Sequence, residues 1–222
     1  GIVHSEDVLL YGARGLEPNP KALLELHKLV KRYYETFAWS HVTLAGVKYS
    51  QEKYRLITEI TEMCLDEKQR FIGVEVGIET GSVRLLKEVM PAKAAPYPAE
   101  EWPNVVEDAF AIMHDHNIVP AATFILGLPG EREEDVIATI ELIERLKDYR
   151  SLIVPMFFVP LGALKDRGWF TREMLTDLHV EAMRKALWHS VRWAEDIVSK
   201  MYFRGLKQAP LKLLIRGVIA FI

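Results

Sequence analysis

Two glycine-rich segments constrain the fold of this chain more than any other feature of its sequence. Each is a short apolar run that stops at glycine, acidic and hydroxyl residues, and a helical pattern follows it. The first covers residues 74–82 (VEVGIETGS) and the second residues 123–131 (TFILGLPGE). Strand–turn–helix units in series are typical of parallel α/β folds, in which polar groups at the carboxyl ends of the strands build the functional site. We therefore expect both turns to lie at one edge of a parallel sheet.

Composition narrows the class of protein further. The 222 residues are enough for one large α/β domain, and the formal net charge of −3 disfavours a nucleic-acid surface, which is usually basic. No apolar stretch reaches the ~18 residues of a membrane-spanning helix, and the N-terminus shows no signal peptide. Cys64 is the only cysteine, so we expect a cytoplasmic protein without disulfides. A single thiol also cannot hold a multi-cysteine metal or iron–sulfur site.

The hydrophobic pattern predicts four βα units and a fifth strand, followed by helices. The expected strands are residues 8–12, 41–45, 71–78, 120–127 and 152–159. The expected helices begin at the Asn19-Pro20 pair and then cover residues 51–67, 82–90, 104–116, 131–147, 171–202 and 212–222. The prolines at 91, 96, 98 and 103 predict an elaborated loop. Five parallel strands are too few for a closed barrel, so we expect a partial (β/α) TIM-like barrel over residues 1–165 and a helical region over 166–222.

Side-chain alternation adds a prediction about the sheet. In the third strand the apolar residues share one face, whereas Glu75, Gly77 and Glu79 share the other. The second strand likewise places His41 and Thr43 on one face. A parallel strand in a dry sheet is apolar on both faces, so this pattern favours a curved sheet whose concave face lines a wet or ligand-filled cavity.

Each polar candidate also has a structural explanation. Glu75 and Glu79 are candidate ligand contacts, but an internal salt bridge to Arg14 or Lys93 would equally satisfy a buried carboxylate. Ser82 could contact a ligand or simply cap a helix. The loop 127–131 resembles a phosphate cradle without the Gly-Lys-Ser/Thr ending of a P-loop, and on its own a tight turn explains it better.

Taken together, the two segments resemble the radical S-adenosylmethionine (radical SAM) superfamily, in particular the branch whose members often carry a cobalamin-binding domain. Residues 77–82 (GIETGS) match the pattern Gly-Ile/Val-Glu-Ser/Thr-Gly-Ser that typically ends the fourth strand of that family. Residues 124–131 (FILGLPGE) match its fifth-strand pattern, Phe-Ile/Met-x-Gly-Leu-Pro-Gly-Glu. The resemblance covers residues 6–165 and implies a partial (β/α)6 barrel that binds S-adenosylmethionine.

The resemblance also implies roles for individual residues. Glu79, Thr80 and Ser82 would approach the ribose or the methionine part of S-adenosylmethionine. Ile125 and Gly127 would pack near its adenine.

Two further regions complete the implied site. Met156 and Phe157, in the strand that would be the sixth of the family, would give backbone contacts to adenine. Tyr11 and Gly12, after the strand that would be the second, would lie near the methionine amino group. The resemblance gives no catalytic residue and no metal ligand within this chain.

Two departures from the family pattern limit what this chain can do by itself. The Cys-x-x-x-Cys-x-x-Cys motif that ligates the [4Fe–4S] cluster is absent, and residues 160–163 (PLGA) replace the usual Pro-x-Pro-Gly-Thr. We therefore expect the C-terminal part of a longer enzyme, inactive alone, whose cluster ligands lie outside this chain. If the enzyme binds cobalamin, as members of that branch often do, the resemblance implies that it does so in a domain upstream of this chain.

The resemblance implies that the whole enzyme generates a 5′-deoxyadenosyl radical for hydrogen abstraction or methyl transfer. The alternatives are a cluster-free α/β domain that binds a phosphorylated small molecule, and a non-catalytic structural fragment. The sequence does not identify the substrate. We also expect self-association through the exposed first strand or through residues 211–222, because unpaired strand edges and apolar patches favour it.

Overall fold

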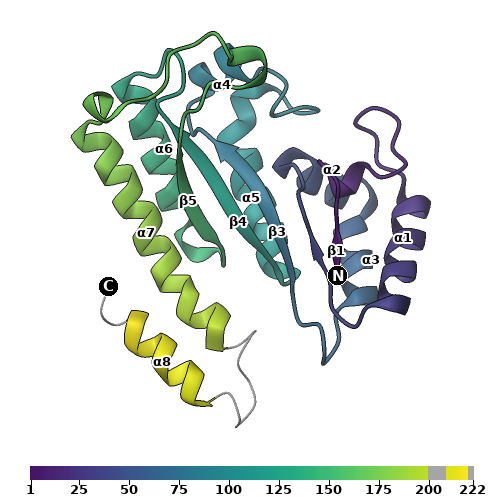
Figure 1. Ribbon diagram of the computed structural model, residues 1–222. Helices are drawn as coiled ribbons and strands as arrows, with labels where there is room; N and C mark the ends of the chain where they lie inside the picture. Colours follow the sequence, from purple (N-terminus) through teal and green to yellow (C-terminus); the bar gives the residue numbers. More distant parts are fainter. Residues whose placement is uncertain (200–208, 220–222) are drawn as a thin grey trace.

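The computed structural model describes residues 1–199 and 209–219, and its strands form two parallel sheets (Figure 1). The smaller sheet pairs β1 (Ile2–Val3) with β2 (Ala38–Trp39), and the larger has the order β3 (Ile72–Glu79), β4 (Ile118–Leu126), β5 (Leu152–Phe157). A bridge between His41 and Glu75 joins the two sheets. The expected parallel α/β class is confirmed, and no closed barrel forms among the described residues.

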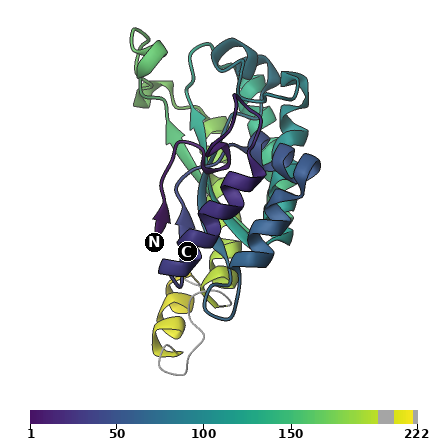
Figure 2. The same ribbon diagram turned by 90° about the vertical axis from the view of Figure 1, so that its right-hand side faces the viewer.

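The helices that connect the strands lie on one face of the sheets, as Figures 1 and 2 show from two directions. The bounds of the α-helices are α1 (Pro20–Tyr33), α2 (Leu44–Tyr54), α3 (Leu56–Cys64), α4 (Val83–Val89), α5 (Trp102–Asp115), α6 (Glu133–Arg145), α7 (Asp177–Ile197) and α8 (Ala209–Ile219). The α7 helix protects the outer edge of β5, because the Ser190 hydroxyl accepts the Ile153 N–H at 2.8 Å and donates to the Ile153 carbonyl at 3.0 Å. Among the described helices, none is both long and apolar enough to cross a membrane.

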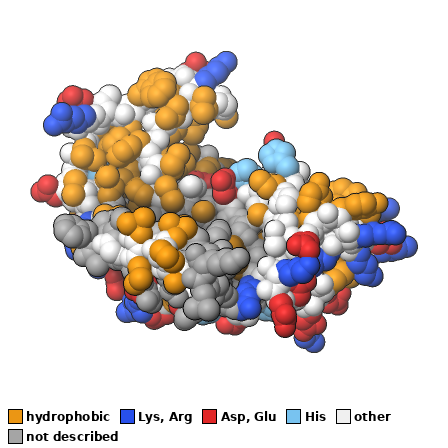
Figure 3. Space-filling model, turned by 60° about the horizontal axis from the view of Figure 1, so that its bottom comes forward, with side chains coloured by type: hydrophobic (Ala, Val, Ile, Leu, Met, Phe, Trp, Pro, Cys, Tyr) orange, Lys and Arg blue, Asp and Glu red, His pale blue; other side chains and the backbone are white. Residues whose placement is uncertain are grey.

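The alternation predicted for the third strand is present. Val74, Val76 and Ile78 are buried in the main core, while Glu75 and Gly77 remain accessible on the other face. In β4 the same alternation leaves Ala121, Thr123 and Ile125 only partly buried on that accessible face. A cavity of about 510 Å³ lies on this accessible face, next to the amino-terminal halves of the strands. Figure 3 shows a hollow with hydrophobic, acidic and histidine side chains around it.

The first two predicted strands are wrong. Residues 8–12 do not form a strand; Val8–Leu10 is a 3-10 turn, because the Asp7 carboxylate accepts the Leu9 N–H and also binds Thr43. Val8 and Leu9 are buried by packing rather than by strand pairing. Residues 41–45 are likewise not a strand beyond the bridge at His41, because Thr43 caps the start of α2.

These corrections change the expected free edge. The end strand of the smaller sheet is β1, so the reason given for self-association through residues 8–12 does not hold. Association through the tail stays a prediction, because three leucines of α8 are exposed: Leu211, Leu213 and Leu214.

The predicted helix over 51–67 is also two helices. Arg55 adopts a left-handed conformation (φ 53°) that ends α2 and begins α3. The long helix expected from residue 171 begins at Asp177, after the cap Thr176. The last helix begins at Ala209, and residues 200–202 and 220–222 of the predicted helices lie outside the described part of the chain.

Candidate functional site

The glycine turn after β3 is closed by packing against α6. A Cβ on Gly81 would lie 2.7 Å from Thr139 Cα and closer still to the Ala138 carbonyl oxygen, so only glycine fits there. The Gly81 N–H donates to Thr139 Oγ1 at 2.9 Å, and the Ser82 N–H donates to Thr80 Oγ1 at 3.1 Å. The Thr80 hydroxyl is therefore engaged inside the protein.

Ser82 is engaged in the same way. Its hydroxyl accepts the Leu85 N–H at 3.1 Å, which caps α4, and donates to the Asp135 carboxylate. Arg84 and the Arg132 N–H also bind Asp135. Burial by itself raises the pKa of Asp135, but the hydrogen bonds from Arg84 and Ser82 outweigh it and hold that pKa below its usual value. The Ser82 hydroxyl thus acts as a helix cap, as one of the two explanations predicted, and its hydrogen bonds are made within the protein.

Glu79 is the strained residue of the β3 end. A register shift between Gly77 and Glu79 interrupts the pairing with β4, and Glu79 has φ +61°, a region that non-glycine residues rarely adopt. Its carboxylate folds back over Gly77, where an added Cβ would lie 2.7 Å from Glu79 Cδ. Glu79 Oε1 pairs with Lys93 Nζ at 2.7 Å, and only 16% and 20% of the two side chains are exposed. The carboxylate thus lies on the accessible face of the sheet, as alternation predicts, and is paired with one of the two partners that the sequence suggested.

Glu75 occupies the other end of this face. Its carboxylate pairs with His41 Nε2 at 3.0 Å, and both side chains are well exposed. Neither Arg14 nor Lys93 is its partner; the pair instead spans the joint between the two sheets and borders the 510 Å³ cavity.

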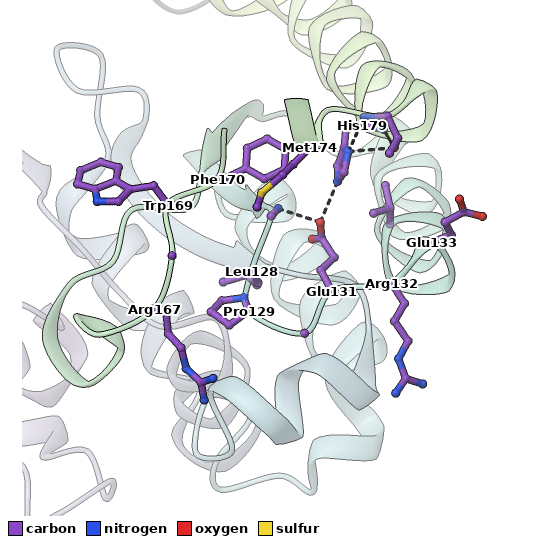
Figure 4. Close-up of a pocket in the computed structure, with 15 residues that line it drawn as sticks. Leu128, Pro129, Glu131, Arg132, Glu133, Arg167, Trp169, Phe170, Met174 and His179 are labelled. Atoms are coloured by element: carbon purple, nitrogen blue, oxygen red, sulfur yellow. Dashed lines mark hydrogen bonds and ion pairs between the residues drawn. The ribbon is translucent and has the colours of Figure 1, made fainter. Parts of the chain in front are cut away.

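The glycine turn after β4, in contrast to the first, is not packed against the backbone of a helix. It borders a cavity of about 600 Å³, whose other walls are residues 167–170 and the start of α7 (Figure 4). The Gly127 N–H donates to Glu131 Oε1 at 2.8 Å, and His179 Nε2 lies 2.9 Å from the same oxygen. Burial raises the pKa of Glu131 above its usual value despite these hydrogen bonds.

His179 is held in one tautomer by its own helix start. The Thr176 backbone N–H donates to His179 Nδ1 at 3.0 Å, so the proton of the neutral ring is on Nε2 and points to Glu131. The sequence interpretation missed His179 because it began the helix too early. The spacing Thr176-x-x-His179, a helix cap and its third residue, is the signal that could have found it.

Phe170 covers the backbone of Gly127. Gly127 has φ +79°, and an added Cβ would lie 2.8 Å from Phe170 Cβ and would overlap its ring. The Phe170 ring stacks on Phe157 with centroids 5.5 Å apart and planes 13° from parallel. It also lies edge to face with the His179 ring, with centroids 5.2 Å apart. No sequence signal places Phe170 here, because residues 158–176 lack a regular pattern.

The structure brings some of the predicted site residues together. Ile125 pairs in register with Met156, and Leu126 pairs with Phe157, so the ends of β4 and β5 form one edge with Gly127. Glu79 reaches this edge from β3, opposite Phe124.

Tyr11 and Gly12 lie elsewhere. The Gly12 carbonyl accepts a hydrogen bond from Asn19 Nδ2 at 3.2 Å, and a Cβ on Gly12 would lie 2.9 Å from Ala22 Cβ, so this turn packs on the start of α1. Neither residue lines the cavity at Gly127. Their role near a methionine amino group stays a prediction.

The described residues do not fit an iron–sulfur cluster. Cys64 is fully buried in α3, and burial raises the pKa of its thiol to about 11, which disfavours the thiolate that binds metal. Within residues 1–199 and 209–219, no group of three or more His, Cys, Asp or Glu side chains is arranged to hold a metal ion.

Comparison with known proteins gives partial matches. No family model matches the chain. Over 89 residues it is 29% identical to a tRNA-2-methylthio-N(6)-dimethylallyladenosine synthase from Fervidobacterium nodosum. This aligned segment covers 40% of this chain and 19% of that relative. Over 81 residues it is 31% identical to a protein of the same name from Ehrlichia ruminantium, which covers 36% of this chain and 17% of the relative. The matched segment thus spans less than a fifth of each relative, and the chain is distantly similar to these two synthases over less than half of its own length.

Proposed function

We propose that this chain is the S-adenosylmethionine-binding part of a radical SAM enzyme that modifies a nucleoside of an RNA substrate. The observation that carries the proposal is the common edge formed by the two motif turns. The turns after β3 and β4 follow neighbouring parallel strands, and the end of β5 completes the edge. The partial similarity to synthases named for a modified tRNA adenosine supports RNA as the substrate class.

The residues at this edge fit the chemical parts of the cofactor. Adenine has two flat faces that stack on apolar groups and a polar edge that makes hydrogen bonds. Ile125 and Gly127 offer the apolar surface, and the backbone of Met156 and Phe157 offers hydrogen-bonding groups. The Glu79–Lys93 pair offers an acceptor and a donor for the hydroxyl, ammonium or carboxylate groups of the rest of the molecule. When bound, S-adenosylmethionine would supply the 5′-deoxyadenosyl radical that abstracts hydrogen from the substrate; the described residues form no site for a cluster that could donate the electron for its cleavage. The role of this chain is to bind and orient that cofactor and to exclude water.

The geometry disfavours the phosphate-binding alternative. A phosphate cradle needs free backbone N–H groups at a helix start. Here the Gly127 N–H is taken by Glu131, and the first turn of α6 carries three acids that would repel an anion: Glu133, Glu134 and Asp135. The strained Glu79 backbone argues in the same way against a purely structural fragment, because such strain concentrates at functional sites.

Binding of S-adenosylmethionine to the 222-residue chain tests the proposal. We expect isothermal titration calorimetry to detect binding to the wild type and a loss of at least tenfold in affinity for Gly127→Ala, because the new methyl group covers the surface that the ring needs. Gly15→Ala is the matched control: Gly15 has φ +62°, similar to Gly127, but open space around it. Absence of binding to the wild type, or an equal loss in both variants, contradicts the proposal.

A further inference from the structure

The ring of Phe170 occupies a place built for a flat group. On one side it lies against the backbone of Gly127, so closely that the glycine has no room for a Cβ. On another side it stacks nearly parallel on Phe157, with ring centroids 5.5 Å apart. A second planar ring cannot reach Gly127 or this face of Phe157 while Phe170 remains there.

The segment that carries Phe170 is attached to the body of the protein by few contacts. Within residues 159–175, the backbone hydrogen bonds besides those of regular elements all join residues three apart in the sequence, so they hold the segment to itself. Several of its apolar side chains are exposed, among them Leu161 at 72% and Trp169 at 60%. Phe170 and Leu164, in contrast, pack onto a small cluster formed by Leu85, Leu128 and Phe158.

The groups that surround the Phe170 ring would suit a planar ligand if the ring moved away. Ile125 near the end of β4 and Gly127 just after it supply an apolar surface, and Phe157 supplies an aromatic face from the end of β5. The neighbouring cavity of about 600 Å³, bordered by Met174 and His179, gives Phe170 space to move into. Displacement therefore needs no change in the sheet.

We propose that Phe170 is a gate residue that holds the purine subsite closed in the free protein, and that the purine of the cofactor replaces its ring against Gly127 and Phe157. This inference rests on the proposed function. A residue that must withdraw before the ligand binds reduces the apparent affinity by a factor equal to the fraction of molecules that are open. Phe170 would thus set both the affinity of the site and its preference for ligands with a flat ring that can repeat the stacking.

Replacement of the ring tests the gate. We expect Phe170→Ala to bind 5′-methylthioadenosine and S-adenosylmethionine about tenfold more tightly than the wild type in calorimetric titrations, since a gate closed in roughly nine of ten molecules costs that factor. Leu161→Ala is the matched control, because Leu161 belongs to the same segment and does not line the cavity; we expect its affinity to equal that of the wild type. Thermal unfolding checks that both variants are folded, and Phe170→Leu, which keeps an apolar contact, should give an intermediate affinity.

The outcomes separate the two proposals. If wild type and Phe170→Ala bind equally, or if the variant binds more weakly, the gate is wrong and the proposed function stands. If the wild type binds neither probe, the proposed function fails, and the gate, which rests on it, fails too. A second measurement uses the wild type alone: ligand binding should increase hydrogen exchange of the backbone amides in residues 159–176, and increased protection of that segment would overturn the gate.

Discussion

The two strand–turn–helix segments look alike in sequence but differ in what their glycines face. Gly81, after β3, meets the backbone of α6, whereas Gly127, after β4, meets the side chain of Phe170. The acids nearby differ in the same sense, because the pKa of Asp135 is lowered and that of Glu131 is raised. A glycine packed on backbone fixes the architecture, because nothing there can move. A glycine packed on a side chain leaves a surface that a ligand can contact when that side chain moves away.

Alanine at the two glycines gives the largest expected difference. We expect Gly81→Ala to lower the free energy of unfolding by about 3 kcal/mol, because the methyl group overlaps the rigid backbone of α6. Gly127→Ala should cost only about 1–2 kcal/mol, the strain of a left-handed alanine, because the Phe170 ring can move away. Urea unfolding of both variants measures this difference. Equal costs would mean that the second turn is as closed as the first.

Asp135 tests the closed turn through its hydrogen bonds. We expect Asp135→Asn to cost about 2 kcal/mol, because Arg84 loses its ion pair and the Ser82 hydroxyl loses a charged acceptor. Glu133→Gln is the control: Glu133 lies in the same helix turn but is exposed, and should change stability by less than about 0.5 kcal/mol. A cost for Asp135→Asn as small as that of the control would show that packing alone holds the β3 turn.

The sequence was most informative where local patterns decide the structure. The three strands of the larger sheet were predicted to within about two residues, because their apolar runs are long and end at glycine or helix-start signals. The strands expected at 8–12 and 41–45 were wrong, because Asp7 and Thr43 hydrogen-bond across 36 residues and a local pattern carries no sign of that. Val8 is buried in the core, as its apolar character indicates, but it lies in a 3-10 turn and not in a strand.

The candidate site shows the same division. Alternation placed Glu79 on the accessible face, and the sequence offered Lys93 as a partner. The roles of Phe170 and His179 depend on where residues 158–176 return to β4, which is a tertiary property with no local signature. Hydroxyl residues in a glycine turn, such as Thr80 and Ser82, are equally suited to capping and to ligand binding, and only packing distinguishes these uses.

The smallest expected effect is the opposite pH dependence of the two turns. The pKa of Asp135 is lowered from 3.8, so its contribution to stability is present above that value and is lost as the pH falls through the lower pKa of the folded state. The pKa of Glu131 is raised from 4.5, so its contribution is fully present below 4.5 and is lost as the pH rises through the higher folded value. In urea unfolding between pH 3 and pH 7, the deficit of Asp135→Asn relative to wild type should therefore shrink toward the acid end. The stability of Glu131→Gln relative to wild type should instead increase toward neutral pH, because the wild type then holds a buried charge that the amide lacks. Parallel trends for the two variants would contradict the assignment of one turn as closed and charge-stabilised and the other as a poorly solvated opening.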